Sequence, residues 1–178
     1  LVTGRRQQRP AADDRVAARH STQLDRARRL TGHAEVRGTN GGGLVAGVGS
    51  ALKALKPAIK VWGVEPETAA PTARSLEMGS PQVFEGWQAS FVDGAGGRSV
   101  FPRMWERMKP VLDGCIVVSL EETRQAMGLL AEKSRVIAEG AGALSVAAAL
   151  TGKAGQGPIV AIVSGGNVDL KKFCELIG

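Results

Sequence analysis

Three consecutive glycines, Gly41, Gly42 and Gly43, stand in the stretch GTNGGGLVAGVGSALKALK at the expected start of a helix. Glycine costs conformational entropy, so a run of it is accepted mainly where the backbone approaches a ligand closely or needs a positive φ. From Leu44 the apolar residues recur at helical spacing, and Pro57 marks the end of that helix. A helix N-terminus presents unpaired N–H groups and the positive end of the helix dipole, so this stretch could bind an anion such as a phosphate. The alternative is a tight turn between a strand and a helix that binds nothing.

A second glycine turn, SGGN at 164–167, lies between the apolar run PIVAIV at 158–163 and a final helical stretch. In an open parallel sheet, ligands bind at the carboxyl ends of the strands. Both glycine turns should lie at that edge, and loops that converge there are better evidence for a site than either turn alone. Taken by itself, Ser164 is also explained as the N-cap of the following helix.

Strands and helices alternate from Gly41 onward. Short apolar, β-branched runs predict buried strands at 59–64, 115–118 and 158–163. Helices are predicted at 44–56, at 71–79, at 98–109, after a capping box of Ser119 and Glu122, at 139–150 and after the SGGN turn, with a glycine-rich loop at 80–97. This alternation predicts an α/β fold: a parallel twisted sheet with helices on both faces.

The formal net charge of +6 is concentrated near the N-terminus. Residues 1–40 contain nine arginines and no lysine, whereas 41–178 is nearly neutral. The first segment is open to three interpretations: a disordered linker, a basic arm that contacts nucleic-acid phosphates, or the product of a reading-frame error. We therefore expect a basic arm at 1–40 and an α/β body at 41–178. The neutral body carries no nucleic-acid motif, which argues against nucleic acid as a partner.

One interpretation of the first glycine turn is a dinucleotide site in an oxidoreductase. Gly41, Gly43 and Ala46 satisfy the pattern G-x-G-x-x-A, and Glu65 ends the next strand about where an acid that binds ribose is expected. Two observations weigh against it. The motif requires a hydrophobic strand just before the glycines, and GHAEVRGT is a poor one; the SGGN turn also stays unexplained.

The order of GGGLVAGVGSALKALKP, IKVWGVEPE, WQASFVDGAGG, AEGAGA and VSGGNVD resembles the C-terminal part of the threonine/serine dehydratases (ammonia-lyases). These are pyridoxal-phosphate enzymes of fold type II and relatives of serine racemase. The resemblance runs in order over about 138 of the 178 residues. It implies a fold like that of the tryptophan synthase β subunit, incomplete in this chain, with 41–178 as the C-terminal portion of the catalytic domain.

The resemblance also implies how the cofactor phosphate is bound. In this family a loop of four glycines holds the phosphate through backbone N–H groups. Gly41, Gly42 and Gly43 match its last three glycines and Leu44 follows them, while Asn40 stands where the first glycine is expected. Asparagine tolerates a positive φ better than most residues.

By the same resemblance, Ser164 forms a hydrogen bond with the pyridine nitrogen of the cofactor. A neutral hydroxyl does not hold that nitrogen protonated, which suits elimination over transamination. Glu139, in AEGAGA, is expected near the cofactor ring; its alternative role is that of an acidic residue in the first turn of a helix.

A divalent cation is a further possibility that the resemblance raises. Glu65 matches a metal-binding glutamate of the serine racemase relatives, and Ala69 matches a residue that offers its backbone carbonyl. The acidic ligand expected two residues later is replaced by Pro71.

The activity that the resemblance implies is the dehydration and deamination of L-threonine or L-serine to a 2-oxo acid and ammonia. It places the Schiff-base lysine in a Ser-Phe-Lys motif upstream of the glycine loop. None of the eight lysines, all of which follow residue 52, stands in such a context. We therefore expect this chain to be a fragment with no dehydratase activity of its own. A non-catalytic binding module with a nucleic-acid-contacting arm is the alternative.

The sequence lacks the features of a membrane-spanning protein, a secreted protein and a cysteine-based metal or redox protein. No apolar run reaches the roughly 18 residues of a membrane span, and the first residues do not follow the pattern of a signal peptide. Cys115 and Cys174 form no metal or redox spacing. We expect a cytoplasmic protein that takes a small amino-acid substrate, and the resemblance implies a homo-oligomer for the intact enzyme.

Overall fold

The computed structural model describes residues 34–38 and 42–178, with side chains from residue 42 onward. Gly32–Gly178 form one compact unit. The basic arm predicted at 1–40 therefore lies almost wholly outside the described residues, as do Asn40 and Gly41. No helix of the described part is long and apolar enough to cross a membrane.

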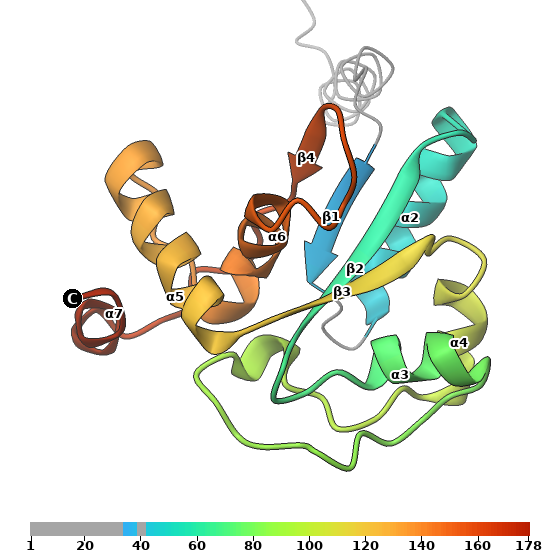
Figure 1. Ribbon diagram of the computed structural model, residues 1–178, viewed down its shortest axis with the longest axis horizontal. Coiled ribbons are helices and arrows are strands. Elements are labelled where there is room, and N and C mark those ends of the chain that lie inside the picture. The colour runs from blue at the N-terminus through green and yellow to red at the C-terminus, as the bar shows by residue number, and fades with distance from the viewer. Residues whose placement is uncertain (1–33, 39–41) are drawn as a thin grey trace, which may run out of the picture. The chain divides into compact units, whose positions relative to one another are not determined.

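Four parallel strands form the sheet described here, in the order β3-β2-β1-β4 (Figure 1). Their bounds are β1 Ala34–Gly38, β2 Lys60–Pro66, β3 Gly114–Val118 and β4 Ile159–Ala161. The three strands predicted from β-branched runs are confirmed, with no end shifted by more than two residues. The prediction of a parallel α/β sheet is also confirmed.

β1 corrects the sequence analysis, because GHAEVRGT was judged a poor strand. Ala34–Gly38 lie at the centre of the sheet and pair with both β2 and β4. A run of five residues that includes an arginine and a glutamate has a low propensity to form a strand. Hydrogen bonding to a strand on each side stabilises it instead. The strand ends directly before the first glycine turn, so it belongs to the α/β body although it lies within the range expected for the arm.

Six helices and two short helical turns follow β1 in the described part of the chain. They are α2 Gly43–Leu55, α3 Pro71–Met78, the 3-10 turn Asp93–Ala95, α4 Pro102–Met108, α5 Leu120–Leu129, the π turn Leu130–Ser134, α6 Gly140–Leu150 and α7 Leu170–Ile177. The capping box predicted for α5 is present: Ser119 Oγ accepts from the Glu122 N–H, and the Glu122 carboxylate accepts from the Ser119 N–H.

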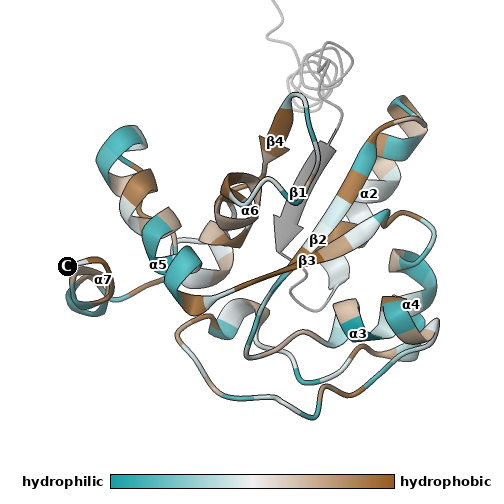
Figure 2. Ribbon diagram, in the orientation of Figure 1, coloured by the Kyte–Doolittle hydropathy of each residue, from teal (hydrophilic) through white to brown (hydrophobic). Residues whose placement is uncertain are grey.

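Helices cover both faces of the sheet (Figure 1). One hydrophobic cluster lies between the sheet and α2 and α4, and includes Val45, Val61, Trp105 and Met108. The other lies between the sheet and α5 and α6, with Leu144 among its fully buried residues. β4 is hydrophobic along its length (Figure 2). α6 is buried from Gly140 to Ala148 except at Val146, so it is the most enclosed helix of this second layer.

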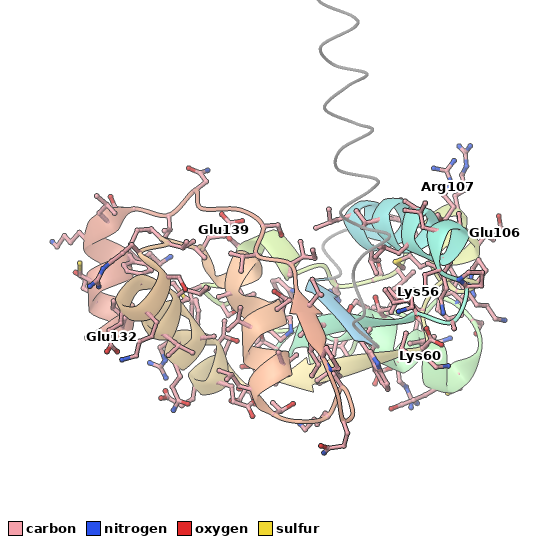
Figure 3. The ribbon with its side chains drawn as sticks, turned by 90° about the horizontal axis from the view of Figure 1, so that it is seen from above. Lys56, Lys60, Glu106, Arg107, Glu132 and Glu139 are labelled. Atoms are coloured by element: carbon pink, nitrogen blue, oxygen red, sulfur yellow. The ribbon has the colours of Figure 1, made fainter. Side chains whose placement is uncertain are left out.

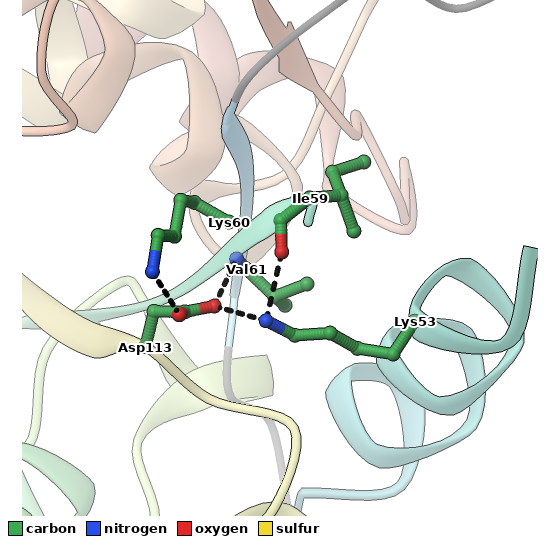
Figure 4. A network of polar contacts seen from close by, with 5 residues as sticks. All are labelled: Lys53, Ile59, Lys60, Val61 and Asp113. Carbon is green, nitrogen blue, oxygen red and sulfur yellow. Dashed lines mark hydrogen bonds and ion pairs between the residues drawn. The ribbon is translucent and has the colours of Figure 1, made fainter. Parts of the chain in front are cut away.

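Asp113 joins the amino ends of β2 and β3 to α2 (Figure 4). Its Oδ2 lies 2.6 Å from Lys53 Nζ and accepts from the Val61 N–H, and its Oδ1 lies 2.9 Å from Lys60 Nζ. The same Lys53 ammonium donates to the Ile59 carbonyl at 2.7 Å. The network thus joins the last turn of α2 to the first residues of β2 and to the residue before β3. It lies at the edge of the sheet opposite the glycine turns.

The pKa of Asp113 lies below its ordinary value. Burial by itself raises the pKa, but the hydrogen bonds from Lys53, the Val61 N–H and Lys60, with the charge of Lys53, lower it by more. A carboxyl whose pKa falls on folding stabilises the protein above its unfolded pKa of about 3.9. That stabilisation is lost as the pH falls through the lower folded pKa.

Asp113→Asn should therefore lower the free energy of unfolding by about 1–2 kcal/mol at pH 7, because the charged hydrogen bonds are lost. The difference from the wild type should shrink below about pH 4. Denaturant unfolding between pH 7 and pH 3 measures both effects. Lys60→Ala is the matched control: the Lys60 side chain is 62% exposed, so its loss should cost less than about 0.5 kcal/mol. A difference between wild type and Asp113→Asn that does not change with pH would contradict this account of the network.

Candidate functional site at the carboxyl edge of the sheet

The two glycine turns lie at the ends of neighbouring strands. β1 leads into the first turn and β4 into the SGGN turn, and the two strands pair in parallel with Val36 opposite Ala161. In that register the end of β1, Gly38, is level with Val163, one residue before Ser164. Adjacent strands are about 4.8 Å apart, so the structure brings the start of the first turn and Ser164 to the same part of the edge. This convergence was predicted from the sequence.

Gly42 begins α2 in a conformation that favours glycine. Its φ is 78°, in the left-handed region, and an added Cβ would lie 2.3 Å from Met104 Cγ and 2.4 Å from Met108 Sδ. At Gly43, the next residue, an added Cβ would lie within 4 Å of no atom in the part of the chain that the structure describes. The chain thus enters the helix through a turn that packs tightly against α4 on one side and is open on the other.

The N-terminus of α2 has no side-chain cap, and the same is true of α4 and α6. No side chain accepts a hydrogen bond from the first N–H groups of α2, and its first turn holds no acidic residue. By contrast, α5 is capped by Ser119 and α7 by Asp169. The first N–H groups of α2 carry the positive end of a 13-residue helix dipole, and the first turn of the helix holds no acidic residue to offset it.

Ser164 follows β4 and is half-buried. The next residue, Gly165, has a φ of 81°, and its carbonyl accepts from the Glu139 N–H at 3.3 Å. The Glu139 carboxylate lies against the same turn, since an added Cβ at Gly165 would be 2.2 Å from Glu139 Oε1. Figure 3 shows Glu139 where α6 begins, on the opposite side of the sheet from Lys56 and Arg107. The structure therefore places Glu139 next to the SGGN turn; its place near the cofactor ring stays a prediction.

A cavity of about 280 Å³ adjoins the first glycine turn over the end of β2. Its walls come from the N-terminus of α2, the N-terminus of α3, the 93–101 segment and α4. They include Gly42, Glu65, Asp93, Phe101 and Met104.

Glu65 has a structural role that the sequence analysis did not predict. Its side chain is 2% exposed, and its two carboxylate oxygens accept from the N–H groups of Thr72 and Ala73, each at 2.9 Å. The carboxylate therefore caps α3, whose own N-cap, Ala70, offers no side-chain acceptor. Pro71 at the first position of the helix has no N–H, so Glu65 serves the next two donors.

The structure does not support the metal site predicted at Glu65 and Ala69. The Glu65 carboxylate points at the start of α3, and Ala69 is fully buried, with its N–H donating to the Pro66 carbonyl. Within residues 34–38 and 42–178, no group of three or more His, Cys, Asp or Glu side chains is arranged to hold a metal ion.

Cys115 lies beneath Glu65. Its Sγ is 3.6 Å from Glu65 Oε2, and burial together with the nearby carboxylate raises the pKa of the thiol well above its ordinary value. The protonated thiol is a poor nucleophile. Cys115 is thus a small packing residue of the sheet.

The structure meets one requirement of a dinucleotide site, the strand before the glycines, but not another, an acid available to bind ribose. β1 provides the strand that must precede the glycines. The acid that this interpretation assigns to ribose is Glu65, however, and its carboxylate is used in capping α3. The pattern G-x-G-x-x-A is therefore satisfied in sequence but not by the chemistry around it.

Of the predicted cofactor-binding residues, the structure places Gly42, Gly43, Leu44 and Ser164 at the carboxyl edge; Asn40 and Gly41 lie outside the described residues. Sequence reasoning missed two residues of α6: Gly142, which contacts the SGGN turn, and Ser145, which bonds to the chain just before that turn. An added Cβ at Gly142 would lie 2.1 Å from the Ser164 carbonyl oxygen, and Ser145 Oγ donates to the Ile162 carbonyl at 2.7 Å. No local signal identifies them, because the pattern of small residues in α6 does not say which of them faces the turn.

Comparison with known proteins agrees with this arrangement. The family model of the pyridoxal-phosphate dependent enzymes matches residues 21–165, a range that contains both β1 and Ser164. The chain is 34% identical over 142 residues to the catabolic L-threonine dehydratase of Escherichia coli (strain K12), which covers 78% of this chain and 43% of that protein. It is 38% identical over 138 residues to the L-threonine ammonia-lyase of Thermotoga maritima, covering 77% of this chain and 34% of that protein.

A solved structure shares the fold as well. The processed form of threonine deaminase isoform 2 from Solanum lycopersicum superposes with a TM-score of 0.77 at 32% identity, over 88% of this chain and 47% of that one. The chain thus spans less than half of the length of each of these three relatives. The α/β fold is that of the fold type II pyridoxal-phosphate enzymes, incomplete here. On these matches, the chain belongs to the pyridoxal-phosphate dependent enzyme family, among its threonine dehydratase (ammonia-lyase) members.

Proposed function

We propose that this chain supplies the phosphate-binding and pyridine-binding part of an enzyme that dehydrates and deaminates L-threonine or L-serine with pyridoxal 5'-phosphate. The observation that carries the proposal is the convergence of the first glycine turn and Ser164 at the ends of paired strands β1 and β4. The identity to L-threonine dehydratases supports the substrate class.

The first glycine turn fits a phosphate group. The N-terminus of α2 has neither a side-chain cap nor an acidic residue in its first turn, and Gly42 and Gly43 leave the backbone bare on the open side. N–H groups at such an end bind a dianion favourably. We assign the phosphate to the loop of Asn40, Gly41, Gly42, Gly43 and Leu44.

Ser164 fits the ring nitrogen of the same cofactor. When bound, pyridoxal phosphate acts as an electron sink for the carbanion formed at the substrate Cα. The Ser164 hydroxyl would donate a hydrogen bond to the ring nitrogen without placing a proton on it. A neutral partner moderates the sink, which favours loss of the β-hydroxyl over transamination.

We expect no turnover of L-threonine by this 178-residue chain alone. By the resemblance, a lysine in a Ser-Phe-Lys motif forms the covalent link with the cofactor and removes the Cα proton. No lysine of this chain stands in that context. The purified chain, incubated with pyridoxal phosphate and L-threonine, should form no 2-oxo acid. Turnover that disappears in Ser164→Ala would show that the catalytic base lies within this chain after all.

Binding of the cofactor skeleton can be tested without that lysine. Pyridoxine 5'-phosphate lacks the aldehyde, so it does not react with surface lysines. We expect it to bind at least about tenfold more tightly than pyridoxine, because the phosphate contacts charge-assisted donors. Inorganic phosphate should compete with it. Equal affinity for the two compounds, measured by fluorescence titration, would overturn the assignment of the phosphate to the glycine turn.

A further inference from the structure

α6 packs directly against the backbone of the SGGN turn. The Glu139 N–H before its first residue donates to the Gly165 carbonyl, and Ser145 Oγ, in its second turn, donates to the Ile162 carbonyl at 2.7 Å. Ser145 is fully buried. The helix thus contacts residues on both sides of Ser164, and two hydrogen bonds fix the direction in which the chain passes over it.

Gly142 is the point of closest approach between α6 and this turn. An added Cβ there would lie 2.1 Å from the Ser164 carbonyl oxygen and 2.5 Å from the Gly165 carbonyl oxygen. Both are backbone atoms, so no side chain can rotate away to make room. An alanine would require the turn and the helix to separate by about 1 Å, since non-bonded carbon and oxygen atoms do not approach within about 3 Å.

The helix itself has little freedom to move instead. Leu144 and Ala148 are fully buried between α6, α5 and the sheet, and Ala147 is 1% exposed. Packed interiors resist displacement, whereas residues 165–167 of the turn are exposed. A Cβ at position 142 would therefore displace Ser164 rather than α6.

We infer that Gly142 is a positioning residue: its missing side chain lets α6 hold the backbone of Ser164 and Gly165, and so fixes where the Ser164 hydroxyl stands at the carboxyl edge. The inference rests on the proposed function, which gives Ser164 the pyridine nitrogen as its partner. Ser145 acts in the same way from the second turn of α6. Both residues are buried, so we infer that they act through Ser164 and not on the ligand directly.

The test compares two ligands that differ only at the ring nitrogen: pyridoxine 5'-phosphate and its 1-deaza analogue, in which C–H replaces nitrogen. One neutral hydrogen bond predicts that the wild type binds the first roughly threefold to tenfold more tightly. In Gly142→Ala this preference should fall to about one, while the preference for pyridoxine 5'-phosphate over pyridoxine stays as in the wild type. A general loss of structure would reduce both preferences together.

Three further variants make the result decisive. Gly128→Ala also replaces a helical glycine, but its Cβ would meet only Ile177 Cβ at 3.8 Å, so both preferences should be unchanged. Ser145→Ala removes the bond to Ile162 without adding an atom, and should lower the ring-nitrogen preference by part of its value even if Gly142→Ala does not fold. Ser164→Ala should abolish it.

The outcomes distinguish failure of the positioning role of Gly142 from failure of the proposed function. Suppose that Ser164→Ala loses the ring-nitrogen preference but Gly142→Ala keeps it. This result overturns the positioning role and leaves the proposed function standing. If Gly142→Ala does not fold, a preference retained in Ser145→Ala has the same meaning. A wild type that does not distinguish the two ligands overturns the role of Ser164 and the inference with it.

Discussion

Replacing Gly42 by alanine should lower the free energy of unfolding by about 2–4 kcal/mol. Two costs add at this position. The φ of 78° is strained for any residue with a Cβ, and the Cβ itself would lie 2.3 Å from Met104 Cγ and 2.4 Å from Met108 Sδ. Equilibrium denaturation by urea, followed by circular dichroism, measures the loss.

Gly47→Ala is the matched control for this variant. Gly47 lies on the exposed side of the same helix, and an added Cβ would meet nothing within 4 Å. The substitution should stabilise the protein by about 0.5–1 kcal/mol, because alanine favours the helix and glycine does not. Equal effects at Gly42 and Gly47 would show that the entry to α2 relaxes freely, and that the first turn is not held by α4.

Glu65→Ala should cost about 2–4 kcal/mol of folding free energy. The buried carboxylate accepts from the Thr72 and Ala73 N–H groups, and without it these donors remain buried at the start of α3 with no acceptor from Glu65. Glu65→Gln keeps the size of the side chain and one oxygen, so it should lose about half as much. Thermal or denaturant unfolding of the two variants gives the comparison.

Glu67, in the turn that follows β2, provides the control. Glu67 Oε1 accepts from the Leu120 N–H at 2.9 Å, but Glu67 is exposed, and water can replace it. Glu67→Ala should therefore cost less than about 1 kcal/mol. If Glu65→Ala costs no more than Glu67→Ala, the carboxylate is not what holds α3 in place, and a different role for Glu65 has to be sought.

Most of the fold follows from local patterns, because helices and buried strands here are marked by periodicity, prolines and glycines. α3 begins at Pro71 and ends before Gly79, and α5 begins at the capping box of Ser119, as their sequences predict. β1 was not predicted because AEVRG is neither continuously apolar nor β-branched. Its stability comes from the two strands that flank it. Pairing between segments that are distant in sequence cannot be recognised from the five residues alone.

Some features of the candidate site could likewise be predicted from the sequence, and others could not. That the first glycine turn and Ser164 would meet follows from a general rule about parallel sheets, and needed only the order of elements. The capping of α3 by Glu65 was not predicted, because the turn from β2 into α3 decides where its carboxylate points. Gly142 was missed for a similar reason: its importance depends on the distance to a backbone 22 residues further along, which no local pattern encodes.

The central claim is that the first glycine turn and Ser164 form one site for a phosphorylated pyridine ligand, and amide chemical shifts test it most directly. Pyridoxine 5'-phosphate is titrated into the ¹⁵N-labelled chain. The N–H signals of Gly43, Leu44 and Ser164 should move together and saturate at one ligand concentration, while that of Asp113, at the opposite edge of the sheet, stays in place. Signals that move only at Asp113 and its lysines, or not at all, would contradict the claim.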